Sequence, residues 1–176
     1  MSGTSLFDTI KKTVFVPPHP AGLPFIGGGI ILSLIFFTFS EFLGILALVF
    51  AVFCLYFFRD PARTTPDRKG LIVAPGDGLV TAIAENVPWP DEIEGAEMRT
   101  STRVSIFLSM LDVHVTRVAL AGSVRQITHR VGEFLNAGTE AASRDNERCT
   151  TVIETPDGQM LAQVQIAGLV ARRIVN

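Results

Sequence analysis

The sequence predicts an α+β protein that is mainly β, in which an N-terminal membrane helical hairpin precedes a domain of antiparallel strands. The chain is 48% hydrophobic, and the apolar excess is concentrated between Leu23 and Phe58. After Phe58, short apolar–polar alternations are separated by turn signals, and no long amphipathic helix follows. We therefore divide the chain into an N-terminal amphipathic segment (1–22), the hairpin (23–58), a linker (59–69) and a β-rich domain (70–176).

The apolar run from Leu23 to Phe58 is too long for one membrane helix. About 36 residues would reach about 54 Å at 1.5 Å per residue, whereas a hydrocarbon core is about 30 Å thick. A single helix would also place Glu41 near mid-membrane, at a cost of roughly 2.5–3.5 kcal/mol. A break at Ser40-Glu41 gives two segments, Leu23–Phe39 and Phe42–Phe58. These two segments span the membrane or enter it as a shallow re-entrant hairpin.

Residues near the hairpin predict its orientation and packing. Basic residues flank it on both sides, namely Lys11, Lys12, Arg59, Arg63, Arg68 and Lys69. Positive charge at both ends predicts that both face the cytoplasm, at the inner membrane of the cell, with Arg59 among the headgroups. Gly27-Gly28-Gly29 is expected to let the first helix approach the second closely, or to bend it. The amphipathic pattern of Met1–Val16 predicts a helix on the membrane surface.

Turn signals at Pro75–Gly78 and Pro156–Gly158 separate short strands in the second half of the chain. The expected strands are Leu71–Ala74, Leu79–Glu85, Arg103–Leu111, His114–Leu120, Ser123–Val131, Thr150–Glu154 and Met160–Val175. Thr139–Arg144 is expected to form one or two helical turns. Pro88–Glu97, which contains Trp89, is expected to be a solvated acidic loop.

Charge and cysteine usage exclude several classes of function. A net charge of −2 offers no general attraction to nucleic acid, so we expect no nucleic-acid partner. Cys54 and Cys149 are far apart and differ in their surroundings, which indicates neither a disulfide framework nor a metal site.

Two residues are candidates for chemistry. His114 stands between Val113 and Val115 in an apolar stretch, so it is either a hydrogen-bonded core histidine or a side chain aimed into a pocket. Asp77 lies between two glycines, where an aspartate is common in ordinary turns. If the two side chains meet, the carboxylate would orient the imidazole and stabilise its charged form. The sequence leaves their distance open.

The chain resembles the phosphatidylserine decarboxylases, in particular the short bacterial and archaeal type. The resemblance runs from His19 to Val175. The matching segments are Phe57–Pro61, Ala74–Gly78, Phe107–Arg117, Gly132–Ala137, Asn146–Arg148 and Gln165–Arg173. The family usually has alanine where Gly76 stands and asparagine where Cys149 stands.

The resemblance implies a membrane enzyme that converts phosphatidylserine to phosphatidylethanolamine. Its cofactor would be a covalent pyruvoyl group, formed when a serine in a Gly-Ser bond near the C-terminus attacks the preceding carbonyl and the chain splits. The pyruvoyl ketone would form a Schiff base with the substrate amine. In this chain Asp77 and His114 match the family's Asp-His pair, with His114 as general base and Asp77 orienting it. Arg117 and Asn136 are candidates for binding the substrate headgroup.

The chain departs from the family at the processing serine, which in the family lies beyond the last matching segment. Its one Gly-Ser pair is Gly122-Ser123, at a turn. We therefore expect the polypeptide as given to be incomplete at its C-terminus and inactive alone, with the small C-terminal pyruvoyl chain of the same precursor as its partner. The alternatives are a non-catalytic membrane-anchored module that binds lipid or a partner, and the same chemistry on archaetidylserine. A homodimer is an open alternative to a monomer.

Overall fold

The computed structural model describes residues 16–66, 68 and 70–176. The helix expected in Met1–Val16 therefore falls almost entirely outside the described residues. The chain divides into two compact units. One contains the described part of Met1–Asp67 together with Leu108–Arg117, and the other contains Arg68–Phe107 and Val118–Asn176.

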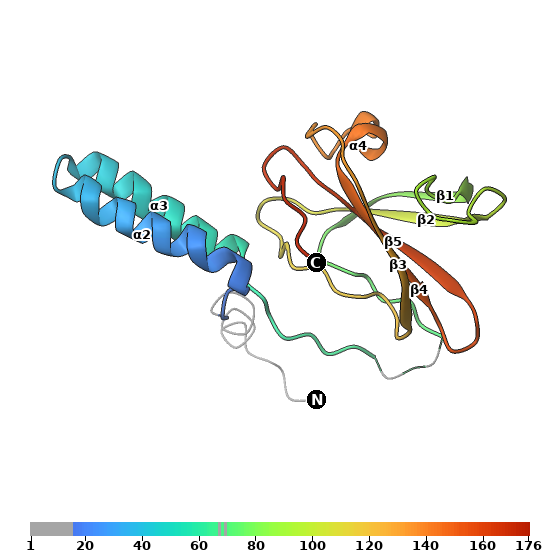
Figure 1. The fold of residues 1–176 in the computed structure, drawn as a ribbon. Helices are drawn as coiled ribbons and strands as arrows, with labels where there is room; N and C mark the ends of the chain where they lie inside the picture. The colour runs from blue at the N-terminus through green and yellow to red at the C-terminus, as the bar shows by residue number, and fades with distance from the viewer. Residues whose placement is uncertain (1–15, 67, 69) are drawn as a thin grey trace. The chain divides into compact units, whose positions relative to one another are not determined.

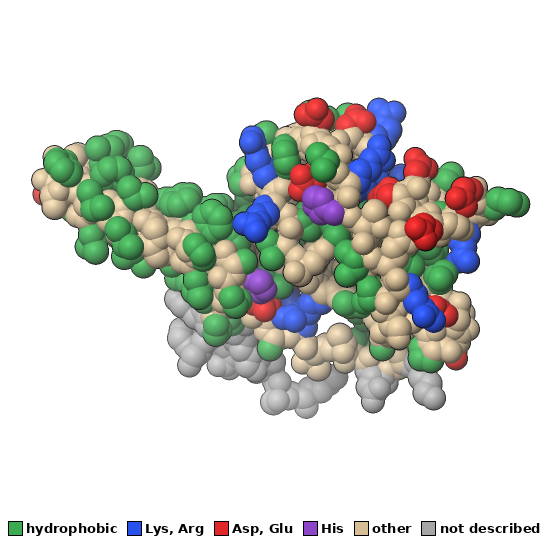
Figure 2. All heavy atoms as spheres, viewed as in Figure 1, with side chains coloured by type: hydrophobic (Ala, Val, Ile, Leu, Met, Phe, Trp, Pro, Cys, Tyr) green, Lys and Arg blue, Asp and Glu red, His purple; other side chains and the backbone are tan. Residues whose placement is uncertain are grey.

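The first unit is built on a pair of antiparallel helices (Figure 1). A short 3₁₀ helix, η1 (Pro20–Gly22), leads into α2 (Leu23–Phe37), and α3 (Glu41–Phe57) returns alongside it. The break falls at residues 38–40, which confirms the predicted helical hairpin. The stretch Pro20–Phe37 is long and apolar enough to cross a membrane, and α3 is a shorter apolar helix. In the view of Figure 2, hydrophobic side chains cover the hairpin along its length.

Small residues bring the two helices together. A Cβ on Gly29 would lie 3.0 Å from the Cβ of Ala51, whereas nothing lies within 4 Å of one on Gly27 or Gly28. The buried hydroxyl of Ser33 donates a 2.8 Å hydrogen bond to the Gly44 carbonyl across the pair. Of the three consecutive glycines, Gly29 is thus the one that makes the close approach.

The second unit contains two antiparallel sheets (Figure 1). The first pairs β1 (Leu79–Pro88) with β2 (Thr100–Phe107). The second has the order β3-β4-β5, from β3 (Ser123–Arg130), β4 (Arg148–Glu154) and β5 (Met160–Ile166). A short helix, α4 (Glu140–Asp145), precedes β4 and agrees with the turns expected there.

The segment expected to be a solvated acidic loop contributes core side chains instead. Trp89, Ile93 and Ala96 are buried and pack with Val152 of β4. In the sequence, the acidic residues around them mask their apolar spacing. These three apolar side chains cover the sheet, and the Glu92 carboxylate also enters this layer, where it accepts a 2.7 Å hydrogen bond from the buried Thr150 hydroxyl.

Several expected strands differ from the structure. The sheet ends at Phe107, and the expected strand His114–Leu120 is irregular chain. Residues Leu108–Arg117 belong to the first unit, so their alternation of apolar and polar side chains reflects packing against the end of α3. Leu71–Ala74 forms no strand, and β5 stops at Ile166 instead of continuing to Val175. Periodicity alone does not distinguish such segments from strands.

Candidate active site

A tight turn begins the segment that carries His114, which we call the histidine loop (Leu108–Arg117). The backbone N–H of Asp112 donates to the Ser109 carbonyl at 2.9 Å. The Asp112 carboxylate in turn accepts the Ser109 N–H at 2.8 Å. Hydrogen bonds from Ser109 lower the pKa of Asp112 below its usual value, so the carboxylate closes this turn in its charged form.

The His114 ring is half-buried under an aromatic side chain. Its centroid lies 4.0 Å from that of Phe57, and the two planes are inclined by 28°. Its Nδ1 lies 3.1 Å from the Asp112 carbonyl, and a proton on Nδ1 satisfies this contact. Burial lowers the pKa of His114. Neutral imidazole is thus favoured, with the Nε2 lone pair left as a proton acceptor.

Arg59 joins the histidine loop to the last turn of α3. Its guanidinium donates from Nη1 to the Tyr56 carbonyl and from Nη2 to the Leu111 carbonyl, both at 2.8 Å. The guanidinium carbon also lies 3.8 Å from the centre of the Tyr56 ring. Arg59 is only 5% exposed. The expectation that the Arg59 guanidinium contacts headgroups is therefore wrong, because carbonyls of its own unit take its hydrogen bonds.

A second link closes the other end of the loop. The guanidinium of Arg117 forms a 2.5 Å ion pair with Asp60, and the side chains are 50% and 28% exposed. Asp60 follows Arg59 directly, so consecutive residues after α3 hold the loop at two points. Arg117 therefore has a positioning role in addition to any contact it makes with substrate.

Asp77 lies in the turn that precedes β1. A Cβ on the next residue, Gly78, would meet the carbonyl of Phe107 at 2.5 Å, so the turn needs glycine there to approach the end of β2. Asp77 belongs to the second unit, and His114 belongs to the first. Their pairing remains a prediction.

Two asparagines follow the sheet residues in the second unit. Asn136 accepts the backbone N–H of Gly138 at 3.0 Å, which forms a local turn before α4. Asn146 is 1% exposed and bonds both backbone groups of Leu135 and the carbonyl of Ala167. Asn146 therefore ties three segments together. Asn136 uses only its side-chain oxygen in the local turn, so its amide nitrogen is left for other contacts.

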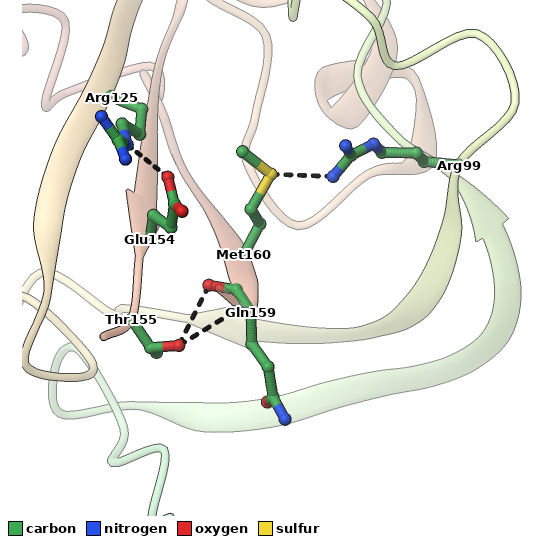
Figure 3. A network of polar contacts seen from close by, with 6 residues as sticks. All are labelled: Arg99, Arg125, Glu154, Thr155, Gln159 and Met160. Carbon is green, nitrogen blue, oxygen red and sulfur yellow. Dashed lines mark hydrogen bonds and ion pairs between the residues drawn. The ribbon is translucent and has the colours of Figure 1, made fainter. Parts of the chain in front are cut away.

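Among the described residues of the second unit, two shallow cavities are lined by residues other than these. One, of about 200 Å³, is lined among others by Trp89, Arg99 and Met160. Figure 3 shows the polar contacts beside it: Arg99 donates to the Met160 sulfur, Arg125 pairs with Glu154, and the Thr155 hydroxyl contacts the Gln159 backbone. The other, of about 480 Å³, is lined by six residues around Ser123 and Thr155. Neither Asp77 nor His114 lines a cavity of this pair.

Comparison with known proteins places this arrangement in a family. The family model described as phosphatidylserine decarboxylase matches residues 50–176. The chain belongs to the phosphatidylserine decarboxylase family. The match includes the end of α3, the histidine loop and the whole of the second unit, which are the parts that hold the four predicted site residues.

Curated relatives in this decarboxylase family carry the name phosphatidylserine decarboxylase proenzyme. The protein of Granulibacter bethesdensis is 48% identical over 164 residues, which cover 93% of this chain and 66% of that protein. The Ruegeria pomeroyi protein is 46% identical over 94% of this chain and 75% of its own length. The Nitrobacter winogradskyi protein is 46% identical over 91% of this chain and 64% of its own length. The chain thus spans roughly two thirds of the length of these relatives.

Sequence reasoning missed three residues that surround the histidine loop. Phe57, Arg59 and Asp60 were assigned to the exit from the membrane, although Phe57–Pro61 was among the segments that match the family. The structure brings these three residues against the histidine loop. The signal available in the sequence was the charged pair Arg59-Asp60 directly after an apolar helix. An assignment of Arg59 to the headgroups hides the contacts of this pair with the histidine loop.

Proposed function

We propose that the chain is the histidine-bearing part of a membrane-bound phosphatidylserine decarboxylase that is made as a proenzyme. The observation that carries the proposal is the half-buried His114 under Phe57, held at the end of an apolar hairpin. Membership of the family and the proenzyme names of its relatives support it. Substrate and product would be phosphatidylserine and phosphatidylethanolamine, with archaetidylserine as the alternative substrate.

His114 is suited to act as a general base. Its lowered pKa favours the neutral ring, and the Asp112 carbonyl holds the proton on Nδ1. We propose that Nε2 takes the hydroxyl proton of the processing serine, and that the same atom later returns a proton to the substrate carbon that has lost CO₂. When formed, the pyruvoyl group supplies the carbonyl that accepts electrons during decarboxylation.

Asp77 is proposed to stabilise the ring once it is charged. The role rests on the match of Asp77 and His114 to the family's Asp-His pair, in which the carboxylate orients the imidazole and stabilises its charged form. In the β1–β2 ladder Leu79 pairs with Phe107, so Asp77 lies two residues before the pair after which the histidine loop begins.

Arg117 and Asn136 are proposed as headgroup contacts. Arg117 remains half-exposed while paired with Asp60, and a guanidinium suits a phosphate oxygen. Asn136 uses its side-chain oxygen for a turn, which leaves donors for a carboxylate or phosphate. Both assignments rest on the chemistry of these groups.

The hairpin is proposed to anchor the enzyme at the inner membrane with the second unit in the cytoplasm. Basic residues on both flanks of the hairpin support this orientation. A small chain from the same precursor would be the partner that carries the pyruvoyl group. Ser123 begins β3 and pairs with Glu154 in the ladder, which makes Gly122-Ser123 unsuited to self-cleavage. We therefore propose that residues 1–176 alone are inactive.

The test compares three forms of the product of the complete reading frame in phospholipid vesicles. The parent protein should cleave itself and convert the serine lipid to the ethanolamine lipid. The His114→Asn variant should lose about 10²–10⁴-fold in self-cleavage rate, because a general base typically contributes that much. The control is His129→Asn, a histidine of β3 that pairs with Glu147. A parent that binds the lipid without converting it would favour the non-catalytic module and overturn the proposal.

A further inference from the structure

The tip of the histidine loop carries two large apolar side chains. Met110 is 51% exposed and Leu111 is 66% exposed. They lie inside the turn closed by Ser109 and Asp112. Turn tips in water are commonly Gly, Asn, Asp, Ser or Pro, because these residues suit the backbone and the solvent. Two adjacent apolar side chains at such a tip point to a non-aqueous contact.

The tip is tied to the last turn of the apolar helix α3. One guanidinium, that of Arg59, donates to the carbonyls of both Tyr56 and Leu111. The Leu111 backbone therefore lies close to the end of α3, since a single arginine side chain bridges the two. In the proposed membrane hairpin, the end of α3 lies at the boundary between acyl chains and headgroups. The apolar tip thus lies beside the end of the apolar hairpin.

The opposite end of the loop has the reverse character. Arg117 pairs with Asp60, which comes after the end of α3, and both side chains reach solvent. The loop therefore presents two exposed apolar side chains beside Tyr56, next to the Asp112 carboxylate that closes the turn, and an exposed charged pair beside Asp60. A lipid surface has the same order, from acyl chains to charged headgroups. A soluble protein partner would not require this gradient.

We propose that Met110 and Leu111 insert into the bilayer surface, so that the histidine loop is itself a membrane-contacting element. The inference rests on the proposed function, because it requires the hairpin to lie in the membrane. It goes beyond anchoring, since His114 is then held at the lipid boundary, and the headgroup is processed without the lipid leaving the bilayer.

The test places single tryptophans in the 176-residue polypeptide, reconstituted in phosphatidylcholine–phosphatidylglycerol vesicles with brominated acyl chains. Trp89 is the one tryptophan of this chain, so all variants carry Trp89→Phe. Leu111→Trp and Met110→Trp report on the tip. Leu34→Trp, at an exposed position of α2, reports on insertion of the hairpin, and Thr65→Trp, in the exposed linker, is the aqueous reference.

We expect blue-shifted emission and bromine quenching for both tip variants, with the ring about 5–10 Å into the boundary. If Leu34→Trp is quenched while both tip variants match Thr65→Trp, the inference is wrong and the membrane hairpin stands. If Leu34→Trp is not quenched either, the proposed membrane location fails as well. The readout is independent of catalysis, so it does not depend on the presence of a pyruvoyl group.

Discussion

The ring of Phe57 stacks on the imidazole of His114, with the ring centroids 4.0 Å apart. Phe57 is the last residue of α3, and His114 lies in the loop that follows β2. A side chain of the apolar hairpin therefore sets the surroundings of the proposed base. The hairpin therefore contributes to the candidate site, in addition to its proposed role as a membrane anchor.

Removing the Phe57 ring should change the pH dependence of self-cleavage. Burial lowers the pKa of His114, and only the neutral ring accepts a proton. Phe57→Ala exposes the ring to water and raises its pKa, so the acid limb of the pH–rate profile should move to higher pH. The matched control is Phe53→Ala, which removes a ring that contacts Phe57 one turn earlier. An acid limb that is the same in the parent and in Phe57→Ala would contradict this account.

Replacing Arg59 by lysine should loosen the histidine loop. A lysine cannot donate to two carbonyls in the planar geometry of a guanidinium or stack in the same way on Tyr56. Losing one such charge-assisted bond should lower the stability of the unit by about 1.5–3 kcal/mol. Hydrogen exchange should rise in Leu108–Arg117, measured by mass spectrometry. Arg63→Lys, in the exposed linker, should leave exchange in the loop unchanged, and equal effects of both variants would exclude a special role for Arg59.

Arg117 can be tested for substrate binding separately from its ion pair. Both Arg117→Ala and Asp60→Asn break the pair, which should cost at most about 1 kcal/mol of stability because it is half-exposed. If Arg117 also binds phosphate, Arg117→Ala should raise the apparent KM about tenfold, or about 1.4 kcal/mol, while Asp60→Asn should not. The measurement is a KM and kcat series on mixed micelles. Parallel KM changes in the two variants would assign Arg117 to positioning alone.

The helix contact at Gly29 should be more sensitive to substitution than the adjacent glycines. Gly29→Leu would drive a side chain into Ala51, whereas Gly28→Leu has open space. Overpacking of this kind typically costs about 1–3 kcal/mol. Thermal unfolding in detergent micelles should therefore show a lower Tm for Gly29→Leu and little change for Gly28→Leu. Equal melting temperatures would mean that the helices do not depend on this contact.

The local pattern of apolar, polar and turn residues was sufficient to predict those helices and strands whose packing partners are close in sequence. The break in the hairpin follows from Ser40-Glu41, and β3 and β4 follow from alternation between turn signals. After Phe107, the alternation of apolar and polar residues continues, so the sequence predicts a further strand. In the structure this segment no longer pairs with β1 and instead contacts residues at the end of α3. The buried side chains of Trp89 and Ile93 were missed because acidic neighbours concealed their apolar spacing.

By itself, the sequence determined the helical hairpin, the antiparallel β-rich unit and the family, because hydrophobic period, turn residues and ordered motifs are all local properties. Only the tertiary structure decided what surrounds His114. Phe57, Arg59 and Asp60 act on the histidine loop across about fifty residues of chain, and no periodic pattern links residues at that separation. The burial that lowers the pKa of His114 arises from these long-range contacts and therefore exists only in the folded chain.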